Sequence, residues 1–218
     1  MANVQDQFLE ATITDNVVRN NLGCIGAGIA TLETRVVIEH NVVADNPQNP
    51  VCFGAMGGGI FVRASSGVIA SNEVSGHVNG GGGAGIAVQG GEVAVLDNVI
   101  RDNRTEFSGG GIMHILGSGV IRGNLLQNNS AQTGGAIHVV PDGKLHIADN
   151  VMIGNDATLQ GSSVELVPFG PQTTQFVRNE IRGNSTVELI VCQQPYRINR
   201  SNELVNESGP ELSAGCSR

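Results

Sequence analysis

The segment VLDNVIRDN at residues 95–103, followed by GGGI at 109–112, decides the fold, because its pattern recurs along nearly the whole chain. It returns as VVIEHNVVADN at 36–46, and as IRGNLLQNN at 121–129 with GGAI at 134–137. In each copy an aliphatic residue stands three positions before an asparagine, and another stands two positions after it. Recurrence at a near-constant period is the signature of a repeat architecture.

Two polar columns appear when the repeats are aligned. The first contains eight asparagines: Asn16, Asn41, Asn72, Asn98, Asn124, Asn150, Asn179 and Asn202. The second lies five positions later and contains Asn21, Asn46, His77, Asn103, Asn129, Asn155, Asn184 and Glu207. Steps of 23 to 31 residues along the first column are too short for pairs of helices. Apolar residues alternate within a repeat, as at Ile86 and Val88, so we predict three short strands and three turns per repeat.

Stacking of these repeats predicts an all-β protein, a parallel β-helix solenoid of about eight coils whose strands pair about 4.8 Å apart. We expect asparagine in the columns for two reasons. Asparagine tolerates the left-handed conformation that a sharp turn between strands needs. Its amide both donates and accepts, so stacked asparagines can form a ladder of hydrogen bonds, whereas stacked aspartates would repel one another.

The composition agrees with a repetitive β structure and excludes several classes of protein. The 218 residues include 31 glycines and no tryptophan, and aromatic residues make up only 3%. The net charge is −8 and Lys144 is the only lysine, so we expect no nucleic acid as a partner. No apolar run approaches the roughly 18 residues that cross a membrane, so we expect no membrane insertion.

The repeat resembles that of right-handed parallel β-helix proteins of the pectin-lyase-like superfamily. The resemblance rests on the pattern aliphatic-x-x-Asn-x-aliphatic-x-x-Asn followed by Gly-Gly-Gly-Ile, and it covers roughly residues 8 to 208. It implies one right-handed β-helix domain over residues 1–218, with a short cap at 1–7, coils at 8–208 and a tail or cap at 209–218. The fold carries lyases, hydrolases, esterases, epimerases and adhesins, so the resemblance alone assigns no activity.

The resemblance also implies where a ligand would bind, because the groove of such enzymes runs along the Gly-Ile sheet between loops of variable length. The longest such loop here is PQNPVCFGAMGG at 47–58, which we call the coil-two loop; others lie at 78–84 and 168–175. Alternation turns one column of this sheet outward: Ala30, Phe61, Ala87, Met113, His138 and Glu165. A second outward column contains Leu32, Arg63, Gln89, Ile115, Val140 and Val167. The candidate binding residues among them are Phe61, Arg63, Gln89, Met113, His138 and Glu165.

The outward columns form an apolar, sparsely charged strip that lacks the usual catalytic groups. A polyuronate lyase needs clustered carboxylates for Ca²⁺ and a basic residue, so we expect no cofactor, and Ca²⁺ only if the protein is such a lyase. His138 and Glu165 lie on neighbouring coils, about 5 Å apart, and with Arg63 they are weak catalytic candidates. The favoured interpretation of the pair is a surface ion pair.

The remaining histidines have structural interpretations. His114 falls in the inward register beside Ile112, where an interior side chain is favoured over a ligand. His77 and His40 fall at turns, where a hydrogen-bonded role is expected. No histidine spacing matches a metal site, so we predict no metal.

The four cysteines form two pairs separated by about one coil, Cys24 with Cys52 and Cys192 with Cys216. Residues stacked one coil apart lie within disulfide range, so we expect a disulfide near each end of the rod, four buried thiols being the alternative. Disulfides indicate an oxidising compartment. The first residues lack the basic and apolar regions of a signal peptide. We therefore expect a secreted or cell-surface protein whose leader is absent from this chain, while a cytoplasmic location stays open.

Two functions remain open at this point. The favoured one is a non-catalytic extracellular module for recognition or assembly that binds a glycan or a protein along the Gly-Ile sheet. The alternative is a carbohydrate-active enzyme, a lyase, hydrolase or epimerase, that uses a groove beside the same sheet. Self-association through the apolar strip or through the thinly capped N-terminal end is a further expectation.

Overall fold

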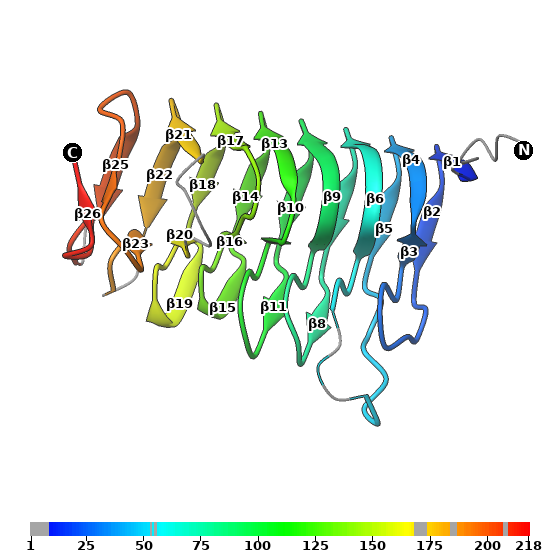
Figure 1. Cartoon of the computed structure of the whole chain (residues 1–218). Helices are drawn as coiled ribbons and strands as arrows, with labels where there is room; N and C mark the ends of the chain where they lie inside the picture. Colours follow the sequence, from blue (N-terminus) through cyan, green and yellow to red (C-terminus); the bar gives the residue numbers. More distant parts are fainter. Residues whose placement is uncertain (1–8, 53, 55, 168–173, 184–186, 207–208) are drawn as a thin grey trace, which may run out of the picture.

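The computed structural model of the chain is a parallel β-solenoid whose coils stack along one axis, with β1 and β26 at opposite ends of the rod (Figure 1). The structure describes residues 9–52, 54, 56–167, 174–183, 187–206 and 209–218. The expected cap at 1–7, Asn184 and Glu207 of the second column, and most of the loop at 168–175 lie outside these residues.

Three sheets run along the rod, and a small one closes its C-terminal end. The 12-stranded sheet contains β1 (Leu9–Thr14), β3 (Ile29–Leu32), β4 (Thr34–Glu39), β6 (Ile60–Ala70), β9 (Ile86–Leu96), β12 (Ile112–Ile115), β13 (Ser118–Arg122), β16 (Ile137–Val140), β17 (Leu145–Ala148), β20 (Val164–Leu166), β21 (Gln175–Val177) and β23 (Ile190–Cys192). The 8-stranded sheet contains β2 (Val17–Arg19), β5 (Val42–Ala44), β7 (Glu73–Ser75), β10 (Val99–Arg101), β14 (Leu125–Gln127), β18 (Val151–Ile153), β22 (Glu180–Gly183) and β25 (Glu203–Asn206). The 4-stranded sheet contains β8 (Val78–Asn79), β11 (Arg104–Thr105), β15 (Ser130–Thr133) and β19 (Asp156–Gln160). The 2-stranded sheet pairs β24 (Tyr196–Arg197) with β26 (Cys216–Ser217).

The coil differs from the predicted three separate strands in one respect. The Gly-Ile strand and the strand before the first asparagine column belong to the same sheet, and in β6 and β9 they are one continuous strand of 11 residues. The third side of the coil is instead the 4-stranded sheet, which begins directly after the second polar column. The two segments stay in one strand although Ala64 and Gly90 have positive φ angles of 48° and 73°, because the pairing of β6 with β9 resumes in the same register at Ser65 and Gly91.

The core follows the predicted register. The aliphatic column two positions after the first asparagines is paired coil to coil in the 8-stranded sheet: Val18, Val43, Val74, Ile100, Leu126, Met152, Ile181 and Leu204. All but the first of these side chains are buried, and they pack with inward residues of the 12-stranded sheet into one cluster along the axis. Each coil therefore buries its apolar side chains on the coils above and below it.

The first polar column is bonded continuously from Asn16 to Asn202. Each Nδ2 donates to the Oδ1 of the next asparagine along the rod. At Asn98, Nδ2 also donates to the carbonyl of Ile69 at 2.9 Å, and Oδ1 accepts from the backbone N–H of Asn72 at 2.9 Å. The side chain thus satisfies backbone groups on both neighbouring coils, which a buried turn requires.

The left-handed conformation at this turn belongs to the residue before the asparagine. The expectation that the asparagine itself adopts this conformation is therefore wrong. Asp97, for example, has a φ of +52° and His40 has a φ of +56°. The asparagines of the column are themselves absent from the positive-φ residues. Asparagine is therefore needed there for its hydrogen bonds, while the preceding position takes residues such as aspartate, histidine or glycine.

Both predicted cysteine pairs are disulfides. Cys24 is bonded to Cys52, with 5.5 Å between the Cα atoms, and this bond ties the coil-two loop to the coil before it. Cys192 is bonded to Cys216, with 5.2 Å between the Cα atoms, and this bond holds the C-terminal sheet against β23.

We predict that the purified, unreduced chain carries both bonds. Its intact mass should be lower than that of the reduced chain by the two hydrogen atoms that each disulfide removes. Mass spectrometry before and after reduction measures this difference. Alkylation of all four cysteines in the unfolded but unreduced chain would contradict the prediction, while the fully reduced chain provides the control.

The N-terminal coil exposes more apolar surface than the coils in the middle. Leu9, Val17, Leu22 and Ile25 are 74%, 65%, 61% and 49% exposed.

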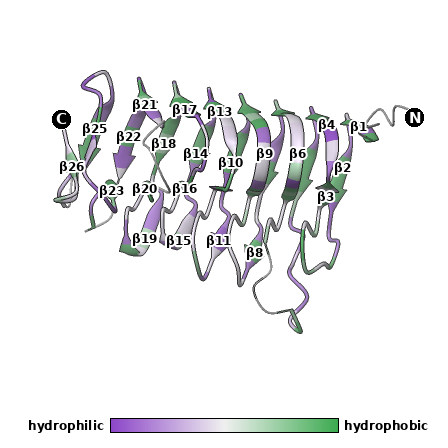
Figure 2. Ribbon diagram, in the orientation of Figure 1, coloured by the Kyte–Doolittle hydropathy of each residue, from purple (hydrophilic) through white to green (hydrophobic). Residues whose placement is uncertain are grey.

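No helix suited to crossing a membrane is found in the part of the chain that the structure describes. Figure 2 shows hydrophobic residues along the strands of the two large sheets, and more hydrophilic residues on β15 and β19 of the 4-stranded sheet.

Candidate functional site

The predicted outward column of the Gly-Ile strands has the expected register but is not exposed. Phe61 pairs with Ala87, Ala87 with Met113, Met113 with His138, and His138 with Glu165. Phe61, Met113 and Glu165 are nevertheless only 2%, 5% and 4% exposed. The expectation of an open, apolar strip available to a partner is therefore wrong for this column.

The strip is covered by the chain's own glycine-rich segments. Gly83, with a φ of +61°, approaches so closely that a Cβ atom placed on it would lie 2.8 Å from the Cβ of Ala87. A Cβ placed on Gly82 would lie 2.4 Å from the sulfur of Met113. Met56 packs on the same cluster. The absence of side chains lets this backbone lie directly on the outer face of the sheet.

The second outward column is more accessible but does not form a site. Arg63 is exposed and Gln89 is half-buried, and the two residues are paired across β6 and β9. Arg63 takes no part in the ion pairs found among the described residues. Leu32, at the N-terminal end of the column, is 46% exposed.

His138 and Glu165 form a partly buried pair rather than the expected surface ion pair. The Nδ1 atom of His138 lies 2.7 Å from a carboxylate oxygen of Glu165, and the two side chains are 12% and 6% exposed. The amide of Gln193 donates to the other carboxylate oxygen at 2.7 Å. Burial raises the pKa of Glu165, but hydrogen bonds from His138, Thr133 and Gln193 outweigh it, so the net direction is downward. Glu165 is thus an ionised group that anchors His138.

The other histidines lie where the sequence placed them. His114 occupies the inward register between Val88 and Val139 and is fully buried, with neither ring nitrogen hydrogen-bonded. His77 is also fully buried and takes the place of an asparagine in the second column. Among the residues that the structure describes, no three His, Cys, Asp or Glu side chains gather closely enough to hold a metal ion.

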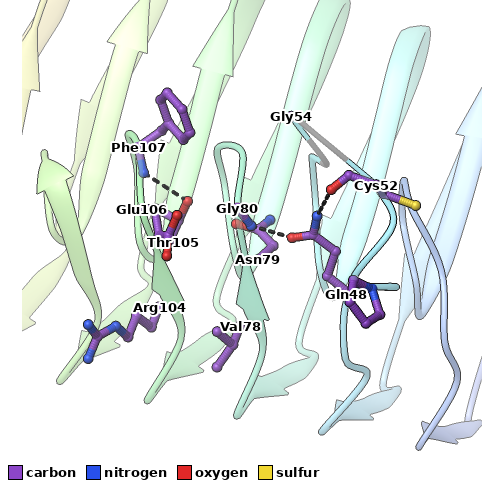
Figure 3. Close-up of a pocket in the computed structure, with 11 residues that line it drawn as sticks. Gln48, Cys52, Gly54, Val78, Asn79, Gly80, Arg104, Thr105, Glu106 and Phe107 are labelled. Carbon is purple, nitrogen blue, oxygen red and sulfur yellow. Dashed lines mark hydrogen bonds between the residues drawn. The ribbon is translucent and has the colours of Figure 1, made fainter.

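An open groove lies on a different face, along the 4-stranded sheet (Figure 3). Its first part has a volume of about 600 Å³ and lies between the coil-two loop and the strands β8 and β11. Its second part has a volume of about 420 Å³ and continues over β15 and β19. The two parts share Arg104, Thr105 and Glu106, so the groove extends from the coil-two loop across the next four coils, which carry β8, β11, β15 and β19.

The floor of the groove follows from strand alternation. Asn79, Thr105, Ala131 and Ala157 point inward and are at most 4% exposed. Val78, Arg104, Ser130 and Asp156 therefore point outward in one row, one per coil. Glu106, Gln132 and Thr158 are exposed two residues further along, where the register between neighbouring strands shifts. There the backbone N–H of Gln132 donates to the carbonyl of Phe107, whose side chain is exposed.

The wall of the groove is fixed by Gln48. Its side-chain Nε2 donates to the carbonyl of Cys52 within the coil-two loop, and its Oε1 accepts from the backbone N–H of Gly80, directly after β8 (Figure 3). The Cys24–Cys52 disulfide holds the other end of the same loop. One side chain and one disulfide thus attach the loop to the coils on either side.

The polar groups of the groove are available to a ligand. None of the ion pairs among the described residues includes Arg104, Glu106 or Asp156. By contrast, Arg101, the last residue of β10, forms ion pairs with both Glu73 and Asp102. The groove therefore presents one cation and two carboxylates that form no ion pair among the described residues. It also presents an amide, hydroxyl groups and an aromatic ring.

Sequence reasoning missed this groove because it placed the site on the Gly-Ile sheet. A signal was present: RTEF at 104–107 and SAQT at 130–133 follow the second polar column directly and alternate polar with small residues. The strands are only two to five residues long, so their alternation is too short to identify a sheet by itself.

Comparison with known families gives a single result. A family model described as a right-handed beta helix region matches residues 52–216, which is more than half of the chain. The chain belongs to the right-handed β-helix family. The predicted fold, a right-handed parallel β-helix of about eight coils, is confirmed. No curated protein and no solved structure shows significant similarity to this β-helix. Because the family match describes a fold, it assigns no activity to this β-helix.

Proposed function

We propose that this protein is an extracellular β-helix module that binds an extended carbohydrate in the groove of the 4-stranded sheet. The observation that carries the proposal is the row formed by Arg104, Ser130 and Asp156, three outward polar side chains on successive coils, beside the exposed ring of Phe107. Hydroxyl-rich ligands are bound by a few placed polar groups together with an apolar surface.

The covered Gly-Ile strip moves the proposed ligand to this face. A ligand on that strip would first have to displace the glycine-rich segments and the side chain of Met56. The groove needs no such displacement, and its outward side chains already extend across four coils. The two disulfides support an extracellular location, because such bonds persist in oxidising compartments.

The test is retention on a panel of immobilised polysaccharides, with and without Ca²⁺. The panel includes polygalacturonate, alginate, a glycosaminoglycan and a neutral glucan. We expect retention of at least one glycan, and we expect Phe107→Ala to weaken it by roughly fivefold, since a stacked aromatic ring contributes about 1 kcal/mol. Val205→Ala, at a position 39% exposed on the 8-stranded sheet, is the matched control and should bind normally. Equal binding by wild type and Phe107→Ala would place the ligand elsewhere, and no retention would contradict the proposal.

An enzyme acting on the same carbohydrate is the second candidate, because Glu106 and Asp156 are two unpaired carboxylates in one groove. Two carboxylates on either side of a glycosidic bond are the usual machinery of its hydrolysis. Shortened products in the same panel, lost in both Glu106→Gln and Asp156→Asn, would favour this candidate. Retention without product formation would favour the binding module.

A further inference from the structure

The second polar column is the base of the groove. Each of the first three segments that line the groove begins within two residues of a column member: Gln48 follows Asn46, β8 follows His77, and β11 follows Asn103. These three side chains are hydrogen-bonded in series. The column therefore sets the spacing between the coil-two loop, β8 and β11.

His77 occupies the central position in a defined hydrogen-bonding state. The Oδ1 of Asn46 accepts from the backbone N–H and the Nδ2 of Asn21, so its Nδ2 is the group that faces Nε2 of His77, at 3.1 Å. On the other side, the Oδ1 of Asn103 lies 2.9 Å from Nδ1 of His77 and accepts from it. A neutral ring with its proton on Nδ1 satisfies both contacts.

A protonated ring cannot satisfy them. Its second N–H at Nε2 would meet the N–H donors of Asn46, and rotating that amide would break its bonds to Asn21 and to the carbonyl of Val18. Water cannot replace the lost acceptor, because His77 is 0% exposed. Its ring lies against the backbone of Gly58 and Gly59, at the end of the coil-two loop.

The charged neighbours of the ring are few. On the preceding coil Asp45 favours the protonated form, but burial has the larger effect and lowers the pKa of His77 overall. On the following coil Asp102 and Arg104 flank Asn103, and both are exposed. The contacts from Gly58, Gly59 and Val74 bring no charge.

We propose that acidification opens the groove by protonating His77, which breaks the column between Asn46 and Asn103 and separates the coil-two loop from β8. This inference rests on the proposed function, since it makes ligand binding at the same groove dependent on pH. The ligand would be held near neutral pH and released in acid.

The direction and size of the pH effect on opening follow from the linkage between opening and proton binding. Because the pKa is lowered in the closed form, the opened form binds the proton more readily, and opening becomes more favourable as the pH falls below that of an exposed histidine. The equilibrium constant for opening should rise about tenfold per pH unit below about 6.5, until the pKa of the closed form is reached. Above that range the column is intact and the effect vanishes.

Hydrogen–deuterium exchange of the full chain tests the switch without any ligand. Wild type and His77→Asn, which completes the asparagine column, are compared at pH 7.5 and 5.0 after correction for intrinsic exchange. We expect peptides 47–52 and 78–83 of the wild type to exchange faster at the lower pH, and those of His77→Asn to show no such increase. His40→Asn, at an exposed turn, is the matched control and should behave like the wild type.

Three results would overturn the inference. They are an unchanged rate in the wild type, the same increase in His77→Asn, and an increase spread evenly over all peptides, including 93–101. If His77→Asn does not fold, NMR of the ¹⁵N-labelled His77 ring in the wild type decides, because the inference requires a neutral, Nδ1-protonated ring at pH 7.5. Loss of glycan retention at pH 5.0 in the wild type alone would connect the switch to binding. Absence of retention at both pH values would contradict the proposed function while leaving the exchange result to decide the switch.

Discussion

Asn98→Asp is expected to destabilise the β-helix by about 3 to 5 kcal/mol at neutral pH, which is the cost of leaving a buried charged or polar group without its partners. Asn98 is 1% exposed and lies in the middle of the first column. The aspartate would lose the two hydrogen bonds that Nδ2 donates to the carbonyl of Ile69 and to Oδ1 of Asn124. It would also place a carboxylate oxygen against two oxygen atoms in a buried site.

Urea unfolding followed by circular dichroism measures this loss as a lower midpoint at unchanged slope. Asn199→Asp is the matched control: it makes the same chemical change at an exposed residue whose Oδ1 accepts the backbone N–H of Ser201, a hydrogen bond that aspartate keeps. The control should stay within about 0.5 kcal/mol of wild type. Equal effects of the two substitutions would show that the hydrogen bonds of the column do not stabilise the fold.

His114→Val is expected to remove an acid-sensitive contribution from the core. Burial lowers the pKa of His114 to about 4, whereas an exposed histidine in the unfolded chain titrates near 6.5. Between about pH 6.5 and pH 4 the unfolded chain therefore binds a proton at His114 that the folded chain does not bind. The folded state loses stability as the pH falls through this range. The loss should reach about 2 to 3 kcal/mol at pH 4.5.

Valine suits this position because the residues paired with His114 on the neighbouring coils are Val88 and Val139. The difference in unfolding free energy between His114→Val and wild type should therefore grow in favour of the variant from pH 7 to pH 4.5. Val95→Ala, which changes a buried core position without adding or removing a titratable group, is the control and should give a difference that changes little with pH. A constant difference for His114→Val would mean that His114 is protonated in the folded state.

The core of the β-helix could be predicted from the sequence because a strand with a period of two leaves few choices. Val43, Val74 and Ile100 recur at one offset from the asparagines, and only one register buries all of them. The disulfides followed from the same register, since residues one coil apart are necessarily close. The left-handed residue was misplaced by one position because asparagine and aspartate both accept that conformation.

The surface was harder to predict than the core. Gly82 and Gly83 indicate a backbone free of side chains, but nothing in their sequence says that this backbone folds over Ala87 and Met113. Burial of the strip depends on the path of a loop, and periodicity does not describe loops. The groove was missed for a related reason, since Arg104 and Asp156 are one row only after the second column has placed their coils in register.

The parallel pairing of every strand along the rod has a mechanical consequence. Backbone and column hydrogen bonds both point from one coil to the next, so a force that peels the end coil away loads one layer of bonds at a time. Each released coil of the regular 26-residue spacing adds roughly 90 Å of slack chain, at about 3.5 Å per residue. The disulfides interrupt this peeling near both ends, because Cys24–Cys52 and Cys192–Cys216 each lock one coil to its neighbour. Under such a force the disulfide-linked coils near both ends therefore stay joined to their neighbours.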